Sequence, residues 1–205
     1  MEGMKPLLSS AKTDWETPQD LFNALNDIFE FDLDVCATEW NTKIPGNFIS
    51  PEENAFVVPW RGDVCWMNPP YGKAENACVY PCKKRKCVQR GYHIDTPIAG
   101  IGDWMHLGMI RSRDANKIVV CLVPARTDTE WFQIVWSHST LIAFLRGRYQ
   151  FVGASSGATF PSCVCVFSYH RPLTGDVYRH MSDLGNVIHP TEGLIRWDGS
   201  DHIEK

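Results

Sequence analysis

The stretch Val64-Cys65-Trp66-Met67-Asn68-Pro69-Pro70-Tyr71-Gly72 joins a short apolar run to two successive prolines. The apolar residues 64–67 predict a buried β-strand. Proline has no N–H for a strand ladder and holds its own φ nearly constant, so the strand must stop there. The sequence therefore predicts a rigid polar loop, residues 68–71, at the carboxyl end of a strand.

A helix and another strand are predicted before this loop. Thr17 can cap a helix whose first position suits Pro18. Apolar side chains then recur on one helical face, at Leu21, Phe22, Leu25, Ile28 and Phe29. Residues 31–36 alternate apolar and polar, which predicts a strand with Asp34 near its carboxyl end. Ligands of α/β folds gather at the carboxyl ends of strands, so we expect Asp34 and Asn68 to face one site.

Helices and strands also alternate after the loop. Residues 103–113 are expected to form a helix, and residues 118–123 a buried strand. The pattern Thr127-Asp128-Thr129-Glu130 is a capping box that predicts the start of another helix. Two more strands are predicted at residues 141–145 and 163–167. This order indicates an α/β layered fold in a single domain over residues 1–205, with no role assigned from residue 170 onward.

Composition limits the class of protein. The chain has 205 residues, 44% of them hydrophobic, which is enough for one substantial core. It contains no run of about 20 apolar residues and no basic-then-apolar leader, so we expect a soluble, cytoplasmic protein without a membrane partner. Without an export signal, its eight cysteines are expected to be reduced or metal-bound rather than paired in disulfides.

The charge gives no overall reason to expect a polyanionic partner, because the net charge is −4 and the pI is about 6.0. Basic residues are nevertheless clustered, which allows a local basic face or an ordinary solvated charge run. One cluster comprises Lys83, Lys84, Arg85, Lys86 and Arg90. Arg126, Arg146 and Arg148 lie elsewhere and are candidates for phosphate or base contacts, with ion pairs to nearby acids as the alternative.

Residues 74–100 are polar, basic and cysteine-rich, and they interrupt the α/β pattern as an insertion. Within it, Cys78-x3-Cys82-x4-Cys87-x5-His93 supplies three thiolates and an imidazole, enough for a closed tetrahedral zinc site. We therefore predict a structural zinc ion; the alternative is a disordered insertion with incidental thiols. The remaining cysteines are expected to be small buried hydrophobes: Cys36, Cys65, Cys121, Cys163 and Cys165.

The loop at residues 68–71 suits the activation of an aromatic amine. The amino nitrogen of adenine is a poor nucleophile, because its lone pair is delocalised into the ring. The Asn68 side-chain oxygen and the Pro69 carbonyl can each accept one amino hydrogen, and Pro70 keeps the loop preorganised. Tyr71 can offer a face on which a flipped base stacks. No general base is required, and the alternative is a proline-rich turn that merely closes a strand.

Several stretches together resemble the phage-encoded DNA N-6-adenine methyltransferases. The similarity runs from about residue 13 to 168, and the loop motif by itself is shared with glutamine methyltransferases. The stretches are Thr17-Pro18-Gln19, Leu33-Asp34-Val35-Cys36-Ala37, Trp60, Asn68-Pro69-Pro70-Tyr71-Gly72, Pro124-Ala125-Arg126-Thr127-Asp128-Thr129, Trp131-Phe132, Gly147-Arg148 and Phe160-Pro161-Ser162.

This resemblance implies a class I methyltransferase (Rossmann-like) sheet with helices on both faces, which binds S-adenosylmethionine. It implies that Thr17 and Pro18 lie near the methionine carboxylate of the cofactor. The residues implied for the rest of the cofactor cleft are Asp34, Cys36, Ala37 and Asn54, the last as acceptor for the cofactor's adenine amino group. Two departures are that no glycine-rich turn follows Asp34 and that only about thirty residues separate it from Asn68.

The implied activity is methylation of the N6 amino group of adenine in double-stranded DNA, with base flipping, in the host cytoplasm if a phage encodes the chain. RNA adenine or a protein glutamine are alternative acceptors for the same loop. A zinc-containing DNA-binding protein without enzymatic activity is a third alternative.

Overall fold

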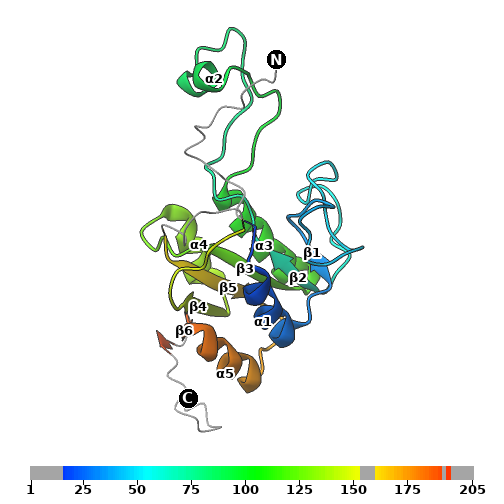
Figure 1. Cartoon of the computed structure of the whole chain (residues 1–205), viewed down its shortest axis with the longest axis vertical. Coiled ribbons are helices and arrows are strands. Elements are labelled where there is room, and N and C mark those ends of the chain that lie inside the picture. Colours follow the sequence, from blue (N-terminus) through cyan, green and yellow to red (C-terminus); the bar gives the residue numbers. More distant parts are fainter. Residues whose placement is uncertain (1–15, 153–159, 191–192, 195–205) are drawn as a thin grey trace.

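The computed structural model describes residues 16–152, 160–190 and 193–194 (Figure 1). Five helices lie in this part of the chain: α1 (Gln19–Phe29), α2 (Arg85–Arg90), α3 (Ile101–Ala115), α4 (Glu130–His138) and α5 (Gly175–Leu184). Seven strands accompany them: β1 (Leu33–Asp34), β2 (Val64–Met67), β3 (Ile118–Pro124), β4 (Leu141–Leu145), β5 (Ser162–Phe167), β6 (Gly185–His189) and β7 (Gly193–Leu194).

The strands form one mixed sheet in the order β1-β2-β3-β5-β4-β6-β7. The first three strands in this order are parallel to one another. β5 is antiparallel to both β3 and β4, so β4 runs in the same direction as β3. The carboxyl ends of β1, β2, β3 and β4 therefore meet at one edge of the sheet, which we call the carboxyl edge.

Helices cover both faces of the sheet (Figure 1). Side chains alternate along β2 because successive residues of a strand point to opposite faces. Cys65 and Met67 join the core beneath α3 and α4, whereas Trp66 joins the core beneath α1 and α5. The α/β class and the helix on the apolar face of residues 21–29 are thus confirmed.

Element boundaries differ from the predictions at several places: α1 has Pro18 rather than Thr17 as its N-cap, α3 is longer at both ends than residues 103–113, and two further differences have a local cause. Residues 31–36 form only the two-residue strand β1, because the Asp34 carboxylate accepts the N–H of Cys36 and the chain turns there. The capping box at residues 127–130 is wrong: α4 begins at Glu130, and the Thr129 hydroxyl donates to the carbonyl of Arg126 in the preceding turn. The region after residue 170 contains α5 and the strands β6 and β7, and these two strands complete the sheet beyond β4.

All eight cysteines lie in the described residues, and none is in a disulfide. Four of the five predicted core cysteines are fully buried, namely Cys65, Cys121, Cys163 and Cys165. Cys36 is only half-buried, which corrects the prediction for that residue. Among the described helices, none has both the length and the apolar character that crossing a membrane requires.

The predicted insertion leaves the sheet between β2 and α3 and carries α2 at its tip, away from the rest of the molecule (Figure 1). We call residues 77–95 the knuckle, and residues 73–76 with 96–99 the stalk. Glu75 and Ile98 pair through two backbone hydrogen bonds of 2.9 and 2.8 Å, which joins the two halves of the stalk. At the base of the stalk the two segments approach so closely that only glycine fits at position 100, because a Cβ there would lie 2.2 Å from the backbone nitrogen of Ala74.

Candidate active site

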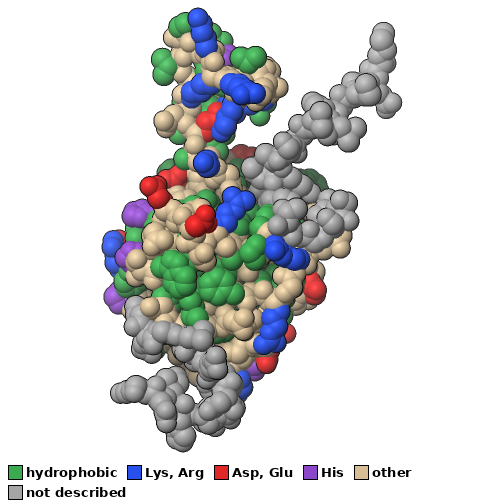
Figure 2. Space-filling model, turned by 90° about the vertical axis from the view of Figure 1, so that its left-hand side faces the viewer, with side chains coloured by type: hydrophobic (Ala, Val, Ile, Leu, Met, Phe, Trp, Pro, Cys, Tyr) green, Lys and Arg blue, Asp and Glu red, His purple; other side chains and the backbone are tan. Residues whose placement is uncertain are grey.

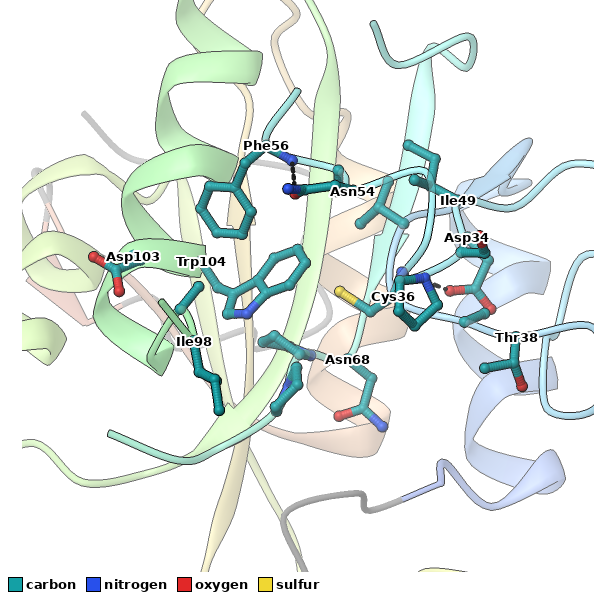
Figure 3. Close-up of a pocket in the computed structure, with 18 of the residues that line it drawn as sticks. Asp34, Cys36, Thr38, Ile49, Asn54, Phe56, Asn68, Ile98, Asp103 and Trp104 are labelled. Carbon is teal, nitrogen blue, oxygen red and sulfur yellow. Dashed lines mark hydrogen bonds between the residues drawn. The ribbon is translucent and has the colours of Figure 1, made fainter. Parts of the chain in front are cut away.

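A cavity of about 1200 Å³ opens at the carboxyl edge (Figure 3). Its walls come from the ends of β1 and β2, the loops that follow β1, the start of α3 and the stalk. Single ligands of drug size usually occupy pockets of about 300–1,000 Å³, so this cavity has room for more than one small ligand. Its position agrees with the expectation that Asp34 and Asn68 face one site, since both line it.

The Asn68 side chain is held from two sides. Its Nδ2 donates to the hydroxyl of Thr17 at 2.9 Å, and its Oδ1 accepts from the hydroxyl of Tyr71 at 2.7 Å. Thr17 is only 2% exposed and comes from the segment directly before α1. These two bonds distinguish the oxygen of the carboxamide from its nitrogen, so they set which atom each side of the group presents.

Tyr71 differs from its predicted role as a stacking face. Its ring packs edge-on against Phe151 and Phe160, with centroids 6.5 and 5.8 Å away, and it does not line the cavity. Its hydroxyl also lies 3.2 Å from the carbonyl of Leu122. Burial raises the pKa of Tyr71 well above its usual value of 10, so the hydroxyl keeps the proton that it donates. Tyr71 therefore positions the Asn68 side chain through the hydrogen bond from its hydroxyl.

The two prolines of the loop both line the cavity. Pro69 is buried and Pro70 is half-buried. The loop thus brings Asn68 and both prolines to the same space.

Asp34 is 3% exposed and its carboxylate organises the loop that follows β1. It accepts the N–H of Lys43 at 3.0 Å, that of Cys36 at 3.4 Å and the hydroxyl of Thr42 at 3.5 Å. Burial raises the pKa of Asp34, and these hydrogen bonds oppose that rise. The residues that this loop brings to the cavity include Cys36, Ala37 and Thr38.

One wall of the cavity is aromatic. Phe56 and Trp104 meet edge to face with ring centroids 4.6 Å apart, beside Ile98 of the stalk (Figure 3). Asn54 lines the same region with a left-handed φ of 62°, and its Oδ1 accepts the N–H of Phe56 at 3.1 Å. Sequence reasoning missed Phe56 and Trp104, because no local pattern distinguishes them from core aromatics. Pro18, the N-cap of α1, does not line the cavity.

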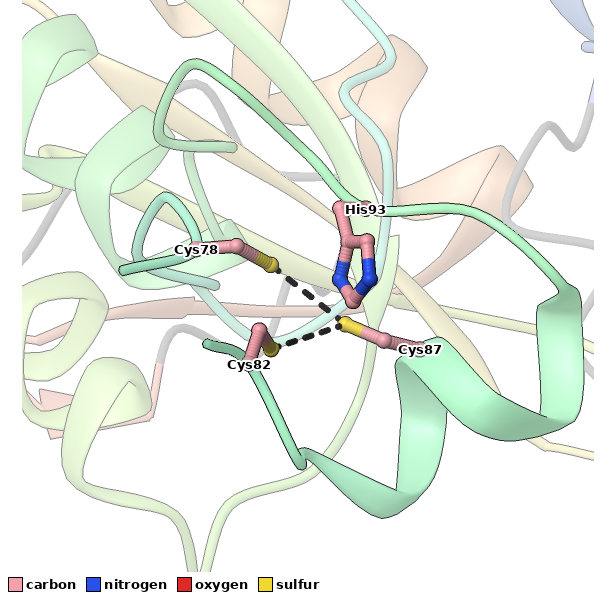
Figure 4. A group of neighbouring side chains, drawn as sticks. All are labelled: Cys78, Cys82, Cys87 and His93. Carbon is pink, nitrogen blue, oxygen red and sulfur yellow. Dashed lines mark hydrogen bonds between the residues drawn. The ribbon is translucent and has the colours of Figure 1, made fainter. Parts of the chain in front are cut away.

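The knuckle brings Cys78, Cys82, Cys87 and His93 together, with all four candidate ligand atoms within 4.8 Å of one another (Figure 4). The Cys87 sulfur lies 3.4 Å from that of Cys78 and 3.7 Å from that of Cys82. His93 Nδ1 is buried without a hydrogen-bond partner. Burial opposes ionisation of Cys78, but hydrogen bonds from the Ile94 N–H and the neighbouring cluster side chains lower its pKa to about 6. This set of soft donors could hold a metal ion.

The three candidate DNA-contacting arginines are exposed and follow strands that end at the carboxyl edge. Arg126 follows β3, and Arg146 and Arg148 follow β4. Arg146 donates to the carbonyls of Ser182 and Asp183 at 3.1 and 3.4 Å, so its guanidinium caps the carboxyl end of α5. This contact was not foreseen from the sequence and gives Arg146 a structural role.

A preorganised Asn-Pro-Pro-Tyr loop at the carboxyl edge of an α/β sheet is an arrangement found in methyltransferase enzymes. Comparison with known proteins shows which family of methyltransferases the chain belongs to. The family model described as DNA N-6-adenine-methyltransferase (Dam) matches residues 6–164. The chain is also 32% identical, over 151 residues, to the DNA N-6-adenine-methyltransferase of Haemophilus phage HP1 (strain HP1c1), covering 72% of this chain and 71% of that one. The chain therefore belongs to the DNA N-6-adenine-methyltransferase (Dam) family. No solved structure matches it.

Proposed function

We propose that this chain transfers a methyl group from S-adenosylmethionine to the N6 amino group of adenine in double-stranded DNA. Membership of the family and the name of the phage relative support the acceptor. A base stacked inside a duplex cannot enter the cavity, so the target adenine must be flipped out of the stack. The cavity at the carboxyl edge is large enough for a flipped base beside a cofactor.

The two-sided hold on Asn68 is the observation that carries this proposal. A carboxamide oxygen has two lone pairs, so it can accept from Tyr71 and also from one hydrogen of the adenine amino group. The carbonyl of Pro69 accepts the other hydrogen. Together these acceptors turn the nitrogen lone pair out of the ring, and they stabilise the positive charge that the nitrogen gains during transfer. The proton leaves to solvent afterwards.

S-adenosylmethionine supplies an activated methyl group on a sulfonium centre when it is bound. We assign Cys36, Ala37 and Asn54 to its cleft, with Phe56 and Trp104 as an apolar wall for its adenine ring. Asp34 acts through the loop that its carboxylate organises, in place of the glycine-rich turn that the chain lacks. Thr17 and Pro18 were both expected near the methionine carboxylate; Thr17 lines the cavity with its hydroxyl committed to Asn68, whereas Pro18 does not line it.

We also propose that the fold is of the class I methyltransferase (Rossmann-like) type. The parallel strands β1 to β3, helices on both faces and a cavity at the carboxyl edge support it. The named strands begin with the short β1 on this side, and a single parallel bridge between Asp34 and Phe48 continues the pairing beyond it.

The cluster in the knuckle is proposed to hold a zinc ion. Three sulfurs and one imidazole are a common zinc ligand set, and the orphaned His93 Nδ1 fits a metal ligand. Four protein ligands leave no open coordination position, so the ion would fold the knuckle and would take no part in methyl transfer.

Transfer of labelled methyl groups to unmethylated DNA, RNA and bulk protein tests the proposed acceptor. We expect transfer to DNA alone; cofactor binding without transfer to DNA would rule the acceptor out. Asn68→Ala should abolish transfer and leave cofactor affinity unchanged, because Asn68 holds the acceptor amine. Asn23→Ala, an exposed position on α1, is the matched control and should behave as wild type. Wild-type turnover in Asn68→Ala would show the loop assignment to be wrong.

A further inference from the structure

The knuckle carries a concentration of positive charge that the rest of the chain lacks. Its five basic residues stand against one acidic residue, Asp95, whereas the whole chain has a net charge of −4. Figure 2 shows these basic side chains gathered on the lobe that projects from the molecule. A polyanion approaching this protein is therefore attracted to the knuckle more than to the body.

Two of the five basic residues are held by hydrogen bonds. Lys84 donates from Nζ to the carbonyl of Asn76 at 2.8 Å. Arg90 pairs with both carboxylate oxygens of Glu75 and donates to the sulfur of Cys87. The other three basic residues, Lys83, Arg85 and Lys86, are exposed. Lys86 has an ion pair of only 3.7 Å with Glu75, and its side chain is 66% exposed.

Large apolar side chains are also exposed on the knuckle, interleaved with these charges. They are Val79, Tyr80, Val88 and Tyr92. Tyr80 packs edge-on against His93, one of the candidate metal ligands. Nucleic-acid surfaces commonly combine basic side chains for phosphates with aromatic rings for sugars or bases.

The knuckle is connected to the rim of the cavity by contacts of the stalk. Both halves of the stalk line the cavity, through residues 74–76 and 96–99. The Glu75–Arg90 ion pair of 3.0 Å connects the stalk to the helix of the knuckle, in addition to the backbone pairing of Glu75 with Ile98. A polyanion held on the knuckle therefore lies next to the segment that forms a wall of the cavity which Asn68 also lines.

We propose that the knuckle is the element of this enzyme that holds the DNA duplex. Lys83, Arg85 and Lys86 contact phosphates of the duplex, and the stalk places the nearby target adenine over the cavity. The metal cluster serves this role by folding the basic surface. The inference rests on the proposed function for its substrate; it adds where the duplex binds.

The test is a triple variant, K83Q/R85Q/K86Q, in which none of the substituted side chains is a metal ligand or a partner of one. The matched control is R61Q/R113Q/R171Q, three exposed or half-buried basic residues near the amino ends of the strands, opposite the cavity. A fluorescent duplex is titrated with each protein over a range of salt concentrations. Metal content and melting temperature confirm that each variant is folded.

Each phosphate contact contributes about 0.9 to the slope of log affinity against log salt, so losing three contacts should lower the slope by about 2.7. The loss should be equal for duplexes with and without a methylatable adenine, because phosphate contacts carry no sequence information. The control variant should keep the slope of the wild type.

Wild-type affinity and salt dependence in the triple variant would overturn the inference and leave the basic face for another partner. Equal losses in the triple variant and the control would also overturn it, because they would show a general effect of charge. The proposed function is judged separately, by methyl transfer from the wild-type protein to the same duplex. If the triple variant loses salt dependence as predicted but the wild type transfers no methyl group to the duplex, the proposed function fails and the inference about the knuckle stands.

Discussion

Replacing Thr17 with valine keeps the shape of the side chain and removes the hydroxyl that accepts from Asn68 Nδ2 at 2.9 Å. Thr17 is 2% exposed, so water cannot easily replace the lost acceptor. Loss of this hydrogen bond of the Asn68 carboxamide costs up to about 1–3 kcal/mol. If the bond keeps the amide oxygen turned toward the adenine, the methyl-transfer rate should fall by about 5- to 150-fold.

Single-turnover methyl transfer at saturating duplex and cofactor measures this rate, and calorimetry measures cofactor affinity. Thr17→Ser restores the hydroxyl and should recover most of the rate. Tyr71→Phe removes the other bond to the same carboxamide, so the two substitutions should be non-additive in a double-mutant cycle. A Thr17→Val enzyme with the wild-type rate would refute the positioning role. A loss confined to cofactor affinity would instead assign Thr17 to the cofactor.

Three further outcomes are expected. Purified protein should contain one zinc ion per chain, and a chelator should remove it and unfold the knuckle; native hydrogen exchange in the metal-free knuckle would contradict this. Asp34→Asn places an amide N–H against the backbone N–H groups that the carboxylate accepts, so cofactor affinity should fall in calorimetry, and an unchanged affinity would count against the loop's role. Gly100→Ala should lower the melting temperature, since its Cβ would lie 2.2 Å from Ala74 nitrogen. Gly102→Ala, where the nearest atom is a side-chain carbon at 3.3 Å, should be milder, and equal effects would contradict the argument.

Most of the fold was predictable, because helices and strands follow local hydrophobic periodicity. The errors lie where a side chain competes with the backbone. Asp34 ends β1 early by accepting the N–H of Cys36. The Thr129 hydroxyl donates to the carbonyl of Arg126 and stabilises a turn where the capping-box pattern predicted helix. Such contacts depend on how the chain is already packed, so residue type alone does not decide them.

The candidate site was predictable in part. Asn68, Cys36 and Asn54 all line the cavity, as expected from their places after strands and in the family pattern. Tyr71 was expected to offer a stacking face, but its half-buried ring packs edge-on against Phe151 and Phe160 and does not line the cavity. The aromatic wall that includes Trp104 was missed, since its position depends on α3 packing beside the stalk.

By itself, the sequence determined the features whose causes are neighbours along the chain. Two prolines end a strand and stiffen the loop after Asn68, and four candidate metal ligands lie within sixteen residues, close enough to meet without help from the rest of the fold. Only the tertiary structure decided that Thr17 meets Asn68, 51 residues away, and that the stalk of the knuckle forms a wall of the cavity. The physical reason is that sheet order and helix packing bring these groups together, and neither leaves a local pattern in the amino-acid sequence.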